Sequence, residues 1–281
     1  MDIAKDAPAR PALRYYGGKW KLAPWIISHF PKHLNYVEPC GGAASVLLQK
    51  PRSPLETYND LDGNVVNFFR VLRDQPDELI RRIRLTPWAR REFEQCKRMQ
   101  GDDLERARSF FAVSRMGLNG STRMESKQLN WRSCVDSHSP IGHNMRDVNF
   151  LYAIAERFSL VQIECLPFME IVPRYDFTGA LFYFDPPYPH DTRNDTQIYT
   201  HEWADANHIE AAALLRQCAG YVVVSGYTCP LYTDLYEAHG WHRVDKEAQT
   251  NSGGKRIESL WLSPRTWNAL RDNHADLPLF A

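Results

Sequence analysis

The 281-residue sequence lacks several features that would assign it to a specialised class of protein. Its six cysteines occur singly, with no C-x-x-C pair, so neither a disulfide framework nor a zinc knuckle is expected. Its 34 basic and 34 acidic side chains cancel, so the overall charge does not indicate a polyanionic partner. No apolar run is long enough to cross a bilayer, and the N-terminal residues lack the apolar core of a signal peptide. We therefore expect a soluble, cytoplasmic protein.

Short apolar runs bounded by turn residues recur along the chain. They lie at 34–38, 55–60, 160–164, 181–185, 221–225, 241–245 and 259–262. Stretches with helical spacing separate most of them, notably at 45–50, 64–74 and 205–220. Strands that alternate with helices predict an α/β fold with a mainly parallel sheet. The continuous apolar run "YVVVS" at 221–225 suits a sheet that is covered on both faces.

One segment, residues 76–149, interrupts this alternation. It contains no convincing strand, and its 14 basic side chains outnumber its 10 acidic ones. We interpret it as a helical insertion into an α/β domain formed by residues 1–75 and 150–281. Its charge alone does not distinguish a nucleic-acid surface from an ordinary solvated helical surface.

The stretch "YVEPCGGAASVLL" at 36–48 predicts a strand, a tight turn and a helix. Gly41 and Gly42 would let a ligand approach the backbone, although the dinucleotide fingerprint G-x-G-x-x-G is absent. The next strand ends near Asp60, where an acid can accept both hydroxyls of a ribose. Asp62 and Asn64 suit the capping of the following helix better, which leaves Asp60 for a ligand.

Two further stretches carry candidate functional residues. In "RYYGGK" at 14–19, an aromatic ring and a lysine flank a glycine hinge. In "LFYFDPPYPH" at 181–190, a buried strand ends in Asp185, two prolines and Tyr188. Prolines have no amide hydrogen, so nearby carbonyls stay free as acceptors, and Tyr188 offers a flat aromatic face. This set suits a planar ring whose exocyclic amine donates to Asp185 and to the Pro186 carbonyl.

Such an arrangement can make an aromatic amine nucleophilic. Two acceptors localise the nitrogen lone pair, and a fixed carboxylate stabilises the positive charge that develops during attack. An activated methyl donor held in line would add the advantage of proximity. This chemistry needs no metal.

The motifs together resemble the Dam-like, D12 class of DNA adenine-N6 methyltransferases, in particular its phage-encoded members. The resemblance spans about residues 13–265 and rests on motifs that stand in the family's order. They are "RYYGGK" (14–19), "YVEPCGGAASVLL" (36–48), "YNDLDGNVVNFF" (58–69), "YFDPPY" (183–188), "SGY" (225–227) and "RIESLWLSP" (256–264). Cys40 and Tyr15 depart from the aromatic residue and the tryptophan that the family often has there.

The resemblance implies an S-adenosylmethionine-dependent enzyme with a seven-stranded Rossmann-like sheet whose last strand is antiparallel. It implies that Asp185, Pro186 and Tyr188 hold the target base. The implied cofactor-binding residues are Tyr15, Gly18, Lys19, Glu38, Pro39, Cys40, Gly41, Gly42, Ser45, Asp60, Phe168 and Asp185.

The resemblance also makes the basic insertion a target-recognition domain for double-stranded DNA. The target adenine lies inside the base stack, so such an enzyme must flip it out. Candidate DNA contacts lie in the loop 114–126 and in a flap at 189–203. They are Arg115, Asn119, Ser121, Thr122, Arg123, Arg193 and Tyr199.

The residues leave other readings open. A cytosine-N4 methyltransferase needs the same acceptors, and a catalytically inactive DNA-binding regulator or an enzyme acting on RNA or protein are further alternatives. The sequence does not choose between GATC and a relaxed recognition site, between monomer and dimer, or between restriction, anti-restriction and regulatory roles.

Overall fold

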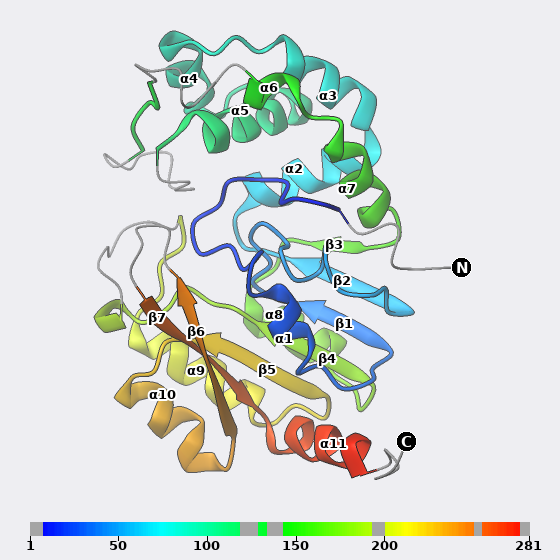
Figure 1. Cartoon of the computed structure of the whole chain (residues 1–281), viewed down its shortest axis with the longest axis vertical. Helices are drawn as coiled ribbons and strands as arrows, with labels where there is room; N and C mark the ends of the chain where they lie inside the picture. The colour runs from blue at the N-terminus through cyan, green and yellow to red at the C-terminus, as the bar shows by residue number, and fades with distance from the viewer. Residues whose placement is uncertain (1–7, 119–128, 134–142, 193–199, 250–254, 276–281) are drawn as a thin grey trace.

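A seven-stranded sheet forms the centre of the molecule (Figure 1). The computed structural model describes residues 8–118, 129–133, 143–192, 200–249 and 255–275. The strands are β1 (Asn35–Glu38), β2 (Leu55–Asn59), β3 (Gln162–Glu164), β4 (Ala180–Phe184), β5 (Tyr221–Gly226), β6 (His242–Gln249) and β7 (Lys255–Leu262). Their order is β3-β2-β1-β4-β5-β7-β6. Strands β1 to β5 pair in parallel, whereas β7 is antiparallel to both β5 and β6, which confirms the predicted sheet.

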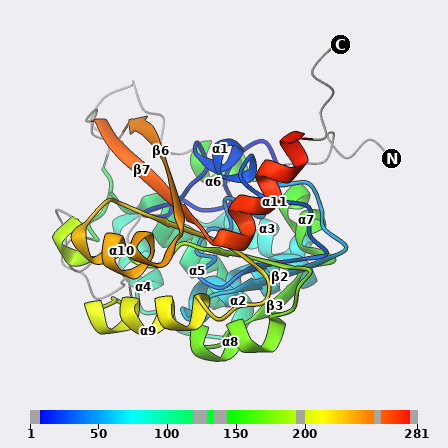
Figure 2. The same cartoon turned by 90° about the horizontal axis from the view of Figure 1, so that it is seen from below.

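Both faces of the sheet are covered by other elements. Since consecutive strand residues point to opposite sides, neighbouring residues join different apolar clusters. Val37 and Phe182 join the apolar cluster under α8 (Phe168–Tyr175), α9 (Asp205–Leu215) and α10 (Pro230–Leu235). Tyr36 and Leu181 join the cluster on the other face, which includes α1 (Ala23–Ile27) and part of α11 (Pro264–Ala275). Figure 2 shows α8 and α9 on one side of the sheet and α1 and α11 on the other. Two 3-10 turns, η2 (His190–Thr192) and η3 (Glu237–His239), complete this part of the chain.

A group of helices lies beyond the β3 edge of the sheet, at the top of Figure 1. It consists of α3 (Pro76–Leu85), α4 (Arg90–Cys96), α5 (Asp103–Met116) and α6 (His143–Arg146), packed against α2 (Gly63–Asp74) and α7 (Phe150–Phe158). Within the described part of 76–149, the only β-type pairing is a single bridge between Gly117 and Trp131. The segment is therefore helical as predicted, while its standing as a separate domain stays a prediction. No helix in the described ranges is long and apolar enough to cross a membrane.

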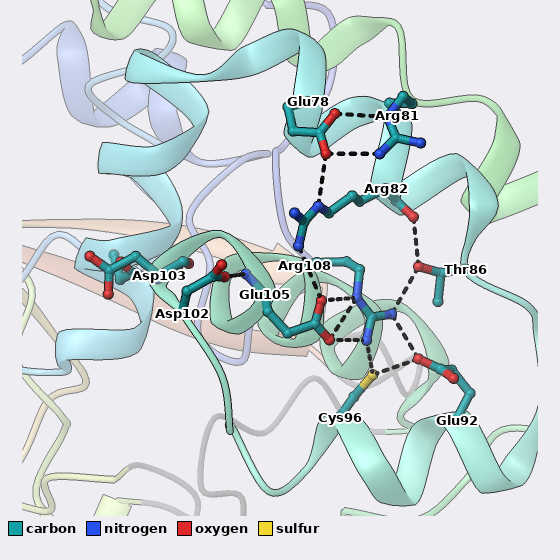
Figure 3. Close-up of polar contacts among 11 residues, drawn as sticks. Glu78, Arg81, Arg82, Thr86, Glu92, Cys96, Asp102, Asp103, Glu105 and Arg108 are labelled. Carbon is teal, nitrogen blue, oxygen red and sulfur yellow. Dashed lines mark hydrogen bonds and ion pairs between the residues drawn. The ribbon is translucent and has the colours of Figure 1, made fainter.

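Arg108 of α5 joins three of these helices (Figure 3). Its guanidinium donates hydrogen bonds to Glu105 on the same helix, to Glu92 of α4 at 2.7 Å and to Thr86 after α3 at 2.9 Å. A fourth contact reaches the Cys96 sulfur at 3.5 Å. Part of the positive charge of the insertion is thus neutralised inside the helical group rather than presented to a partner.

Two of the three predicted helices are present, and one prediction is wrong. Helices α2 and α9 lie at 63–74 and 205–215, but residues 45–50 form successive turns instead of a helix. Ala44 has a φ of 54°, which breaks helical geometry at the start. The Leu47 carbonyl accepts a hydrogen bond from the Arg157 side chain at 2.7 Å, and Gln49 donates to the Trp20 carbonyl at 2.8 Å. These tertiary contacts override the local periodicity.

Candidate active site

The candidate site is a cavity of about 1390 Å³ at the carboxyl ends of the central strands. Strand β1 continues to β2 on one side, whereas β4, which pairs with β1 on its other side, continues towards β5. Ligands of open α/β sheets bind beyond the strand ends at such a switch in direction. The predicted catalytic and cofactor-binding residues all line this cavity: Tyr15, Gly18, Lys19, Glu38, Pro39, Cys40, Gly41, Gly42, Ser45, Asp60, Phe168, Asp185, Pro186 and Tyr188. Their individual roles stay predictions.

The glycine turn after β1 is held closely against β2. Gly41 donates its N–H to the Asn59 carbonyl at 2.8 Å, and Tyr58 donates its hydroxyl to the Gly42 carbonyl at 2.7 Å. A Cβ atom on Gly41 would lie 2.3 Å from the Tyr58 ring, and Gly42 has a φ of +47°. Only glycine fits both requirements, so the sequence keeps this wall of the cavity free of side chains.

Asp60 supports the same turn from the end of β2. Its two carboxylate oxygens accept the N–H groups of Gly42 and Asp62, each at 2.8 Å. Burial raises the pKa of Asp60 to about 6, and these two backbone donors oppose that rise. Each oxygen still has a lone pair for a ligand hydroxyl. Sequence analysis missed the contact between Asp60 and the glycine turn.

Asp62 performs the predicted capping of α2. Its side chain accepts the Asn64 N–H at 2.9 Å. Its second oxygen accepts a hydrogen bond from the Thr200 hydroxyl at 3.0 Å. Thr200 also lines the cavity, so the end of the predicted flap is attached close to Asp60.

Asp185 follows β4 and pairs with Lys19. The Lys19 ammonium lies 3.0 Å from the Asp185 Oδ1 atom, and it donates to the Gly17 carbonyl at 2.9 Å. It also lies 4.7 Å from the centroid of the Tyr188 ring. Burial raises the pKa of Asp185, and Lys19 opposes this rise. Burial alone would lower the pKa of Lys19, but Asp185 and Glu258 raise it above its ordinary value.

Two buried carboxylates near Asp185 differ in how well they were foreseen. Glu38, at the end of β1, was predicted; its Oε2 atom has no hydrogen-bond partner among the described residues. Burial first, and then the neighbouring Asp185, raise the pKa of Glu38 to about 8. Glu258 of β7 was missed, although it accepts the Tyr188 hydroxyl at 3.0 Å. The available signal was an acid directly before the largely apolar run "SLWL" at 259–262.

Asn59 links the two rims of the cavity. Its side-chain amide donates to the Pro39 carbonyl at 2.7 Å and to the Leu166 carbonyl at 3.0 Å, and its oxygen accepts the Leu166 N–H at 2.8 Å. Phe168 follows Leu166 by two residues. Its ring centroid lies 6.0 Å from that of Phe184 and 5.0 Å from that of Trp203. Phe168 also lines the cavity, and its contact with a cofactor stays a prediction.

Most predicted DNA contacts fall outside the described residues, namely Asn119, Ser121, Thr122, Arg123, Arg193 and Tyr199. Arg115 is described, and it donates to the Ala12 carbonyl at 3.1 Å while lying over the Phe111 and Phe150 rings. Burial lowers the pKa of Arg115 to about 10. Arg115 thus has an internal structural role, and its contact with DNA stays a prediction.

His208 lies in the interior of the protein beneath the cavity. His208 is 1 % exposed, and its Nδ1 atom lies 3.2 Å from the Tyr232 hydroxyl. It packs against Trp203, so it belongs to the core beneath the site.

Comparisons with known proteins agree with the resemblance. The family model described as D12 class N6 adenine-specific DNA methyltransferase matches residues 15–250. The chain is 27% identical over 285 residues to the Type II methyltransferase M1.LlaDCHI of Lactococcus lactis subsp. cremoris. It is 26% identical over 273 residues to the DNA adenine methylase of Escherichia coli strain K12 and 25% identical over 273 residues to that of Salmonella typhi. Each comparison covers 89% of this chain and 94% of the relative.

The matched region contains the helical segment, the glycine turn and the Asp-Pro-Pro-Tyr motif. The family is specific for adenine, which decides between the two amines that the acceptors alone would allow. The chain belongs to the D12 class of N6 adenine-specific DNA methyltransferases.

Proposed function

We propose that this methyltransferase transfers a methyl group from S-adenosylmethionine to the N6 amine of an adenine flipped out of double-stranded DNA. The observation that carries the proposal is the single cavity that joins the glycine turn and Asp60 to Asp185, Pro186 and Tyr188. Its volume of about 1390 Å³ exceeds the roughly 300–1,000 Å³ of ordinary small-molecule pockets. A cofactor and a base together account for that size.

The residues of the glycine side fit the cofactor. Gly41 leaves a bare backbone wall, and Asp60 retains acceptor capacity for ribose hydroxyls. The Glu38 Oε2 atom is a buried acceptor without a partner among the described residues, which suits the ammonium of a methionine moiety. When bound, S-adenosylmethionine supplies a methyl group that is activated by a sulfonium. The acids Asp60 and Glu38 favour the positive charge of this sulfonium.

The residues of the Asp185 side fit the target base. Lys19 fixes the Asp185 carboxylate, and the Pro186 carbonyl stands beside it in a backbone that two prolines make rigid. These two acceptors take the hydrogens of the adenine amine, direct the nitrogen lone pair out of the ring and stabilise the positive charge that develops. The Tyr188 ring provides the aromatic contact for the extruded base, which helps to offset the few kcal/mol that flipping costs.

The helical segment 76–149 is the part of the chain that we propose grips the duplex around the flipped base. The loop 114–126 and the flap 189–203 supply side chains to phosphates and base edges. A cytoplasmic location and a phage-type origin complete the proposal. The first rests on the scattered cysteines and the short apolar runs, and the second on the motifs.

Digestion of DNA exposed to the purified protein, with identification of the methylated nucleoside and single-base mapping, tests the proposal. N6-methyladenine is the expected product. Asp185→Ala should lower methyl transfer by about a hundredfold or more while cofactor binding is kept, since the carboxylate acts on the base. Asp60→Ala should instead weaken cofactor affinity.

The matched control is Asp234→Ala, which removes an exposed carboxylate of α10 outside the cavity and should leave both measurements unchanged. N4-methylcytosine as the only product, or tight DNA binding with no methyl transfer, would contradict the proposal.

A further inference from the structure

Glu258 lies where a side chain of β7 reaches the catalytic cavity. Alternation along β7 places it on the same face as Leu260 and Leu262, which join the cluster that contains Tyr183. Asp185 comes directly after the end of β4 and lines the same cavity. Glu258 is only 8 % exposed, and it lines the cavity.

The Tyr188 hydroxyl interacts with both carboxylates. It donates to the Glu258 Oε2 atom at 3.0 Å. It also interacts with Asp185: burial raises the pKa of Asp185, and both Lys19 and the Tyr188 hydroxyl lower it. A tyrosine hydroxyl has one proton, so it can serve only one of the two carboxylates as a donor.

The geometry favours Glu258 as the acceptor of this proton. Tyr188 meets hydrogen-bond geometry with Glu258, whereas the Asp185 Oδ1 atom, ion-paired with Lys19 at 3.0 Å, has no partner in hydrogen-bond geometry among the described residues. A buried acceptor without a hydrogen-bond partner can accept a hydrogen bond from a ligand. The ring is held at the same time by Tyr227, whose centroid lies 4.7 Å away in an edge-on arrangement.

We propose that Glu258 is a positioning residue that holds the Tyr188 hydroxyl proton away from Asp185, so that Asp185 keeps an acceptor oxygen for the amine of the target base. The inference rests on the proposed function, because it assumes that this amine meets Asp185. Without an acceptor at Glu258, the Tyr188 hydroxyl would turn to Asp185 and compete with the substrate for it.

A double-mutant cycle in the full-length enzyme tests the proposal. Glu258→Ala should lower kcat for adenine methylation by about tenfold or more, as expected for a competing hydrogen bond to a charged group. Glu258→Gln keeps a weaker acceptor and should lower kcat by roughly threefold. In the Tyr188→Phe background, whose own rate sets the baseline, neither substitution should change kcat by more than about twofold, because no hydroxyl is left to redirect.

Two further measurements separate this role from a merely structural one. Cofactor affinity by equilibrium titration, and base extrusion by the fluorescence of 2-aminopurine at the target position, should both be unchanged in Glu258→Gln. Additive losses of kcat in the double variants, unchanged kcat in the single ones, or lost base extrusion would overturn the proposal. Glu258→Gln keeps the cycle decisive if Glu258→Ala does not fold. A wild-type enzyme that methylates no adenine would contradict the proposed function itself.

Discussion

Substitution of Glu56 by glutamine should destabilise the protein strongly, because Glu56 neutralises two buried cations. Glu56 is 3 % exposed, and its Oε1 atom lies 2.6 Å from the Lys50 ammonium and 2.8 Å from Arg157 Nη2. Arg157 Nη1 binds the other oxygen. Lys50 and Arg157 are each only 4 % exposed, so water cannot replace the lost carboxylate.

The magnitude follows from this burial. Removing one partner of a buried ion pair costs about 3–5 kcal/mol. Each kcal/mol lowers Tm by about 2–4 °C in domains near this size, so Glu56→Gln should lower Tm by roughly 6–20 °C at pH 7. Burial already lowers the pKa of Lys50 to about 8, so its ammonium can release its proton at higher pH. The loss of Tm should therefore be smaller at pH 9.

Thermal unfolding followed by circular dichroism at the two pH values measures the effect. The matched control is Glu78→Gln, because Glu78 forms hydrogen bonds to Arg81 and Arg82 on the exposed side of α3 (Figure 3). Solvent screens those pairs, and the control should leave Tm almost unchanged. Equal shifts of Tm in the two variants would refute the argument from burial.

Two further predictions concern the glycine turn and the strand that leads to it. Gly41→Ala places a methyl group against Tyr58 and should raise the cofactor Kd, measured by equilibrium titration, by about tenfold or more. The control is Gly63→Ala, whose methyl group meets open space. Equal cofactor Kd values in the two variants would contradict the prediction. Because burial raises the pKa of Glu38 to about 8, its contribution to stability is present at pH 4 and is lost as the pH rises to 8. The Tm of Glu38→Gln relative to the wild type should therefore rise between pH 5 and pH 9, and a constant difference would refute it.

The fold was predictable because its signals are local. Most strands lie in or beside a short apolar run between turn residues, and Asp62 caps α2 as its position indicates. The helix expected at 45–50 does not form, because the Leu47 carbonyl accepts a hydrogen bond from Arg157, which lies more than a hundred residues away in the sequence. No pattern within one segment contains that information.

The site was partly predictable for the same reason. Lys19 and Asp185 each belong to a recognisable motif, although only the fold brings them within 3.0 Å. Glu258 escaped prediction because its importance comes from Tyr188, which reaches it from another strand end. Arg115 shows a different case, since the resemblance predicts a DNA contact for a side chain to which the fold also gives an internal partner.

The amide of Asn59 has a consequence for ligand binding. Hydrogen bonds from this one planar group join Pro39 to Leu166, so the spacing of the two loops is fixed by the folded chain rather than by a bound molecule. A receptor with such a brace does not have to order its loops when it is filled, and little binding energy is lost in doing so.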